Sequence, residues 1–163
     1  MKKVEIVKAE RIRKMFREFS ERPNARIISQ LTDAVLDSKD PEITDAILES
    51  FYFECTNLGV YGLAIHCLGL VKDARALHRL TQCFDALSDQ DALPQDPCLR
   101  AICADHLLRS AQAILDVVSG GGRANGGAIA AIKRIAECDC VPPDIRRRAT
   151  NAFREETGQS IHC

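Results

Sequence analysis

The chain has 163 residues, of which 46% are apolar and 28% are charged, and its net charge is −1. A chain of this length and composition is globular rather than disordered and can bury one hydrophobic core. No apolar run approaches the roughly 20 residues that a membrane-spanning helix needs, and a charged amphipathic segment stands where a signal peptide would be apolar. We therefore expect a single cytoplasmic domain over residues 1–163, without a membrane partner.

Apolar residues recur at helical spacing along the whole chain, and aromatic residues make up only 5% of it. No stretch shows the sustained alternation of apolar and polar residues that is typical of strands. The pattern predicts an all-α protein. The expected helices lie at about 3–20, 24–37, 41–57, 60–71, 74–87, 97–118, 126–138 and 143–157.

Two of these helices have clear apolar stripes that we expect to be buried. The stripe of helix 24–37 consists of Ile27, Ile28, Leu31, Ala34 and Val35. The stripe of helix 97–118 consists of Leu99, Ile102, Cys103, Leu107, Ile114 and Val117.

Local signals mark where several helices begin, end and pack. Asp73 is suited to cap helix 74–87, and Gly59 is suited to end helix 41–57. Gly62 and Gly69 lie inside helix 60–71, although each costs roughly 1 kcal/mol relative to alanine there. Glycines at such a cost indicate close backbone packing, so we expect another helix to cross here.

Similar phrases recur along the chain. Leu68-Gly69, a short turn and Asp73-Ala74-Arg75-Ala76 lead into a second helix rich in leucine, and Asp40 precedes Asp73 by 33 residues. Leu99-Arg100-Ala101 and Ile145-Arg146-Arg147 repeat another phrase at a spacing of 46 residues. Periods of this size are typical of helical repeats.

These phrases resemble the HEAT-like repeats of phycobilin lyase subunits and of small bacterial scaffold proteins. Residues 60–84 follow the pattern closely, except that Ala74 and Lys72 stand where proline and glycine are usual. The resemblance covers about residues 24–157 and implies an α-solenoid of helical hairpins, with residues 1–22 as a terminal capping helix.

The chain contains eight cysteines. Cys55, Cys67, Cys83 and Cys103 fall on or beside apolar stripes, where cysteine behaves as a small apolar residue. Cys138-Asp139-Cys140 and His162-Cys163 are the local pairings closest to metal ligands, but the Cys-x-x-Cys spacing of structural zinc sites is missing. We expect reduced thiols, no bound metal and no cofactor.

Charge is distributed unevenly along the chain. Residues 1–26 carry a net charge of +5, residues 27–99 a net charge of −8 and residues 100–163 a net charge of +2. This distribution is explained either by solvated helix faces or by an acidic middle that binds a basic partner or the basic end of another copy of the chain.

Repeated helical hairpins are more typical of binding scaffolds than of enzymes. We expect a non-catalytic scaffold that binds another protein through its concave surface, which the second helix of each hairpin would line. The exposed positions expected there are Asp45, Glu49, Tyr52, His78, Gln82, Asp85, Lys133, Arg134 and Glu137.

Two other functions are possible from the sequence. The resemblance to bilin lyases implies an accessory protein that handles a tetrapyrrole, although the chain is poor in aromatic residues for a large planar pocket. A HEAT-like DNA glycosylase would need a basic, aromatic-rich surface, whereas the middle of this chain is acidic and has no tryptophan. We therefore expect no nucleic-acid partner.

Overall fold

A computed structural model describes residues 2–36, 38–53, 57–71, 73–89, 91–120 and 124–161, with the side chains of residues 2–7, 52 and 53 left out. Within these ranges the protein is all-α, as predicted. The helices are α1 (Lys2–Glu21), α2 (Ala25–Val35), α3 (Pro41–Phe53), α4 (Leu58–Val71), α5 (Ala76–Ser88), α6 (Pro97–Ser119), α7 (Gly126–Glu137) and α8 (Pro143–Thr157). Over the described residues, each helix is too short or too polar to cross a lipid bilayer.

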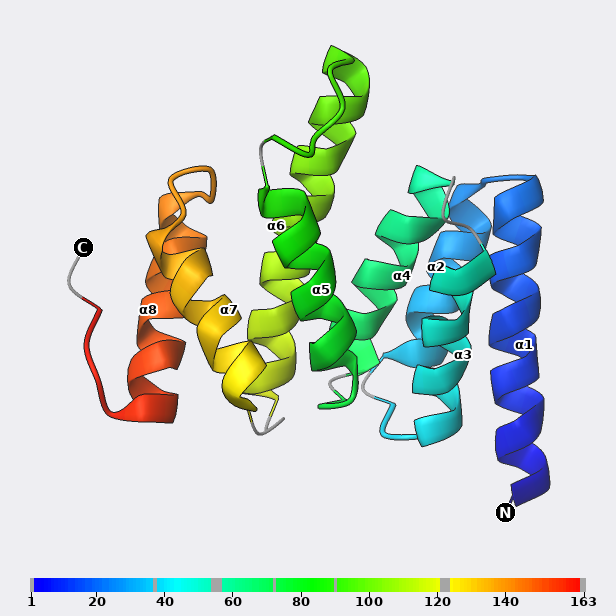
Figure 1. Cartoon of the computed structure of the whole chain (residues 1–163). Coiled ribbons are helices and arrows are strands. Elements are labelled where there is room, and N and C mark those ends of the chain that lie inside the picture. Colours follow the sequence, from blue (N-terminus) through cyan, green and yellow to red (C-terminus); the bar gives the residue numbers. More distant parts are fainter. Residues whose placement is uncertain are drawn as a thin grey trace.

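The helices alternate between two layers along the chain (Figure 1). In the first layer α1 contacts α3, α3 contacts α5, and α5 contacts α7; in the second, α2 contacts α4, α4 contacts α6, and α6 contacts α8. Large apolar side chains fill the space between the layers, among them Leu68 of α4, Phe84 of α5 and Ile114 of α6, which are fully buried. One continuous cluster of buried residues joins the helices into a single core.

The closest helix crossing brings α4 against α6, and the two glycines explain it. A Cβ atom on Gly69 would lie 2.9 Å from Ala113 Cβ and 3.1 Å from Ala113 Cα. A Cβ atom on Gly62 would lie 2.5 Å from Nε2 of His106. The distances of 2.9 and 2.5 Å are too short for real Cβ atoms, so the predicted close crossing at Gly62 and Gly69 is confirmed.

Part of the expected core is wrong. In α2, Ile28 is 38% exposed and Ala34 is also exposed, whereas Ile27, Leu31 and Val35 are buried. In α6, Leu99 is 40% and Ile102 is 39% exposed. Helical periodicity identifies an apolar stripe but not the length over which a neighbouring helix covers it.

The expected role of Gly59 is also wrong. The described part of α3 runs to Phe53, and α4 begins at Leu58, so Gly59 lies in the first turn of α4 rather than ending α3. Asn57 starts α4 because its side-chain oxygen accepts hydrogen bonds from the N–H groups of Gly59 and Val60, at 3.0 and 3.2 Å.

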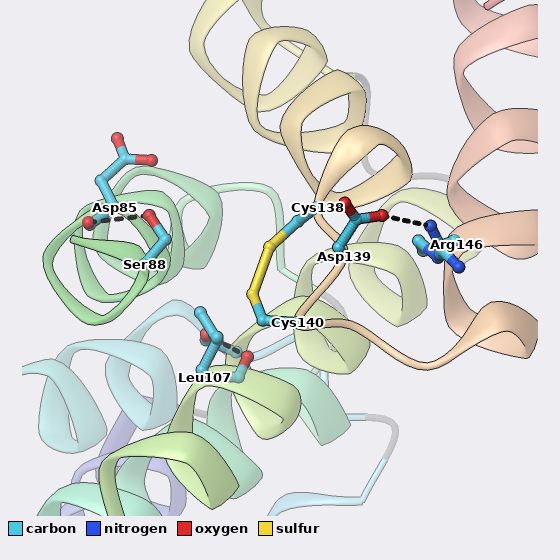
Figure 2. The surroundings of a disulfide bond; sticks show 8 residues. Asp85, Ser88, Leu107, Cys138, Asp139, Cys140 and Arg146 are labelled. Atoms are coloured by element: carbon cyan, nitrogen blue, oxygen red, sulfur yellow. Dashed lines mark hydrogen bonds and ion pairs between the residues drawn. A yellow bond between two sulfur atoms is a disulfide. The ribbon is translucent and has the colours of Figure 1, made fainter. Parts of the chain in front are cut away.

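The expectation that all cysteines are reduced is wrong for one pair. Cys138 and Cys140 form a disulfide in the turn between α7 and α8 (Figure 2). Cys67, Cys83 and Cys103 are buried free thiols, as their positions on apolar stripes suggest, and Cys98 is an exposed free thiol. Burial raises the pKa of Cys67 to about 12, so this thiol stays protonated and unreactive.

Candidate protein-binding surfaces

The first layer is connected by arginine–carboxylate pairs between successive helices. Arg13 of α1 donates to both carboxylate oxygens of Glu49 on α3, at 2.6 and 3.0 Å. Arg134 of α7 donates to Asp85 of α5 at 2.6 Å. Hydrogen bonding to Arg13 lowers the pKa of Glu49, so this carboxylate stays charged.

The remaining link in this layer is centred on Arg75, just before α5. Its guanidinium donates to Asp45 of α3 at 3.1 Å, to the Pro41 carbonyl at 2.8 Å and to Asp73 at 2.8 Å. Asp73 also accepts hydrogen bonds from the Arg75 N–H and from the Thr44 hydroxyl, at 2.9 and 2.8 Å. Asp73 does not cap the helix in the predicted way: α5 begins at Ala76 with Arg75 at the N-cap position and no side-chain cap hydrogen bond, and Asp73 accepts from the Arg75 N–H just before it.

The network around Asp73 makes a pH-dependent contribution to stability. Partial burial opposes the charge of Asp73, but hydrogen bonds from Arg75 and Thr44 outweigh it and lower the pKa of the carboxyl. The folded protein therefore binds this proton less tightly than the unfolded chain. The stabilisation is present above the pKa of an unfolded aspartate, about 4, and is lost as the pH falls through the folded-state pKa.

We expect Asp73→Asn to remove part of the loss of stability that the wild type shows on acidification. The measurement is the urea midpoint at several pH values on both sides of about pH 4. Asp33→Asn is the control, because it removes an exposed carboxylate on α2. Equal pH slopes for Asp73→Asn and the wild type would contradict the assignment.

The nine residues predicted to bind a partner all lie on α3, α5 and α7, and these helices share one layer. Asp45, Glu49, Asp85 and Arg134 belong to the ion pairs between helices. His78 and Gln82 of α5 are exposed and are bonded to each other at 3.1 Å. The two remaining exposed residues with described side chains, Lys133 and Glu137, form a pair along α7 at 3.9 Å. The side chain of Tyr52 lies outside the described residues.

These ion pairs reduce the net negative charge that this surface would present to a partner. Glu49 and Asp85 belong to the acidic middle that is predicted to bind a basic partner, but each already contacts an arginine of the same chain. The partners Arg13 and Arg134 come from helices that are 36 and 49 residues away in the sequence. The acidic character of residues 27–99 is therefore partly neutralised inside the molecule.

A second candidate surface is the beginning of α6, which extends past the end of α5 (Figure 1). All residues from Pro97 to Ile102 are exposed, and Cys103 is the first buried residue of the helix. Leu99 and Ile102 are one turn apart and together form a small apolar patch. The Asp96 side chain caps the helix by accepting from the Leu99 N–H at 2.9 Å, so this exposed turn is well formed.

A hollow of about 270 Å³ opens between α1, α3 and α4. Its lining residues are Arg13, Phe16, Arg17, Ala46, Glu49, Ser50 and Val60. Ligand pockets usually exceed about 300 Å³, and the Arg13–Glu49 pair already joins two of the lining side chains. The hollow is small for a tetrapyrrole.

A cluster of polar and aromatic side chains lies between α3, α4 and α6. The Tyr61 ring stands edge-on to Phe51, with the centroids 5.3 Å apart, and lies 5.6 Å from the ring of His106. Burial raises the pKa of Tyr61 and lowers that of His106, so both groups are neutral at pH 7. Nδ1 of His106 is buried without a hydrogen-bond partner among the described residues. The cluster packs three helices together.

The described residues contain no group of three histidine, cysteine or acidic side chains that could hold a metal ion. Comparisons with protein families, with characterised proteins and with solved structures find no match to this chain.

Two features of these surfaces escape the sequence analysis. The exposed patch of Leu99 and Ile102 has the same helical spacing as a buried stripe. Only the polar linker before Asp96 indicates that the beginning of α6 is not packed against other helices. Arg13 lies among several basic residues of α1, and no pattern distinguishes it as the partner of Glu49.

Proposed function

We propose that the protein is a non-catalytic scaffold that binds another protein. The binding surface would be the exposed face of α3, α5 and α7, with the first turns of α6 as an apolar anchor at its edge. The exposure of Leu99 and Ile102, one turn apart on a projecting helix end, carries the proposal. Fully burying a leucine or isoleucine side chain against a partner is worth about 1.5–3 kcal/mol, whereas exposed polar groups mainly determine specificity.

The ion pairs of the first layer support this proposal in a second way. Arg13–Glu49, Arg75–Asp45 and Arg134–Asp85 connect four successive helices across the exposed side. Each exposed pair contributes little stability, about 0.2–1 kcal/mol. However, together they restrict sliding between neighbouring helices, so a partner would meet a surface that is already ordered and would lose less entropy on binding.

The test is capture of partners from native lysate by the tagged chain, identification by cross-linking and mass spectrometry, and measurement of the Kd with the purified partner. We expect Leu99→Ser combined with Ile102→Ser to weaken binding at least about 10-fold, because burying each of these apolar side chains against a partner is worth about 1.5 kcal/mol or more. His78→Glu combined with Gln82→Glu should also weaken binding, since both residues are exposed on α5.

The matched control is Ile28→Ser combined with Leu36→Ser, which removes one exposed apolar side chain of α2 and one directly after its end. Equal losses in the α6 and α2 variants would contradict the proposed surface. A purified chain that takes up a coloured tetrapyrrole and captures no protein would favour the ligand-handling alternative instead.

A further inference from the structure

The disulfide between Cys138 and Cys140 is not explained by the scaffold function. Cys138 caps the end of α7, and Cys140 lies two residues later in the turn that leads to α8. The bond therefore encloses only Asp139. It is placed on the same side of the molecule as the end of α5, where Asp85 and Ser88 lie (Figure 2).

This disulfide is expected to contribute little to the stability of the fold. The stabilisation from a cross-link grows with the number of residues in the closed loop, and this loop is close to the shortest possible. Other interactions already hold the turn: the Val141 N–H donates to the Cys138 carbonyl at 3.1 Å, and Arg146 donates to Asp139 at 3.0 Å. Val141 and Ile145 are also buried on the core. The turn should therefore persist when the bond is reduced.

The two sulfur atoms differ in access. Cys140 is exposed, and the neighbouring Asp139 side chain is 99% exposed, so solvent reaches this side of the turn. Cys138 is half-buried and packs against the hydrophobic core. Thiol–disulfide exchange requires that a thiolate reach one sulfur in line with the bond, so attack is expected at Sγ of Cys140.

We propose that Cys138 and Cys140 form a thiol–disulfide exchange site whose substrates are low-molecular-weight thiols and their disulfides. An external thiolate attacks Sγ of Cys140, the Cys138–Cys140 bond breaks, and the Cys138 thiolate leaves and takes a proton from water. A second external thiolate then attacks the external sulfur of the mixed disulfide and releases Cys140. Two external thiols become one disulfide, and their two electrons reduce the protein disulfide to two thiols; the reverse reaction with an external disulfide restores the bond.

Exposed disulfides are more labile than structural disulfides, which resist reduction. The buried thiols Cys67, Cys83 and Cys103 cannot take part without unfolding of the helices that cover them. Among the described cysteines, exchange is therefore expected to be confined to Cys138 and Cys140, apart from modification of the exposed Cys98; Cys55 and Cys163 lie outside the described residues. This inference does not depend on the proposed scaffold function.

The test uses the full chain carrying Cys98→Ser, incubated in buffers of reduced and oxidised glutathione, quenched with N-ethylmaleimide and digested with trypsin. The peptide 135–146 contains both cysteines and no other. We expect this peptide to pass reversibly between the disulfide and the doubly labelled form as the glutathione ratio changes. Far-ultraviolet circular dichroism should stay constant throughout. A disulfide that is reduced only after urea unfolds the chain, or helices that unfold on reduction, would show a structural bond and overturn the proposal.

Single variants test the direction of attack. In Cys138→Ser the remaining Cys140 should form a mixed disulfide with oxidised glutathione at least about 10-fold faster than Cys138 does in Cys140→Ser, because access limits the half-buried sulfur. Equal rates for the two variants would contradict attack at Cys140. Failure of the wild-type pair to form a disulfide in oxidised glutathione would contradict the exchange site itself.

Discussion

Phe84→Ala is expected to lower the free energy of unfolding by about 3–5 kcal/mol. Phe84 lies on α5 and is fully buried in the core between the two helix layers. Its removal loses the transfer free energy of the ring and leaves a cavity that surrounding helices cannot fill completely. Since small domains are stable by only about 5–15 kcal/mol, this substitution should produce one of the lowest urea midpoints among single variants.

The control for Phe84→Ala is Leu36→Ala, which also shortens a large apolar side chain. Leu36 follows the end of α2 and is 54% exposed, so its truncation should change stability by no more than about 0.5 kcal/mol. Phe84→Leu, which keeps part of the volume, should fall between the two. A loss for Phe84→Ala as small as that for Leu36→Ala would show that the two layers do not pack on this ring.

The helices were predictable because most carry an apolar stripe and several also carry a start signal. Asp96-Pro97 and Asn125 are sequence features, and in the structure Asp96 and Asn125 cap α6 and α7 through their side chains. Gly62 and Gly69 revealed a helix crossing because a costly residue inside a helix needs a packing reason. Local chemistry of this kind is contained in a short window of sequence.

Contacts between distant segments were not predictable in the same way. The periodicity of Leu99 and Ile102 matches that of Leu107 and Ile114, yet the first two are exposed because no helix lies over the beginning of α6. Similarly, helical spacing predicted that Glu49 of α3 is exposed, whereas it is half-buried beside Arg13, and no spacing indicated that Arg13 would pair with it. Which surface is covered, and by which residue, depends on the arrangement of all eight described helices.

The disulfide is another contact that the sequence pattern did not predict. Cysteine positions on stripes correctly indicated that Cys67, Cys83 and Cys103 are buried thiols. The spacing of Cys138-Asp139-Cys140 argues against a metal site. It does not indicate that the two thiols join each other across one residue. The turn between α7 and α8 brings their Cα atoms to 5.4 Å, a separation that a disulfide can bridge.

The close contact between α4 and α6 at Gly69 gives the other large expected effect on stability. Gly69→Ala should lower the free energy of unfolding by about 1–2 kcal/mol. A methyl group at Gly69 would meet the Cβ and Cα atoms of Ala113, which cannot move away without shifting α6. Overpacking of this kind costs about 1–3 kcal/mol, which exceeds the gain of about 0.5–1 kcal/mol from replacing a glycine inside a helix. The urea midpoint of the purified variant measures the difference.

Two further variants separate this clash from other effects of the substitution. Ala113→Gly removes the methyl group that the new side chain would meet, so the double variant should recover most of the loss, and the two substitutions should be strongly non-additive. Gly126→Ala is the control for propensity alone, because a Cβ atom there meets nothing within 4 Å; it should leave stability unchanged or raise it slightly. If Gly69→Ala stabilises the protein as much as Gly126→Ala does, α4 and α6 do not cross at the distance described.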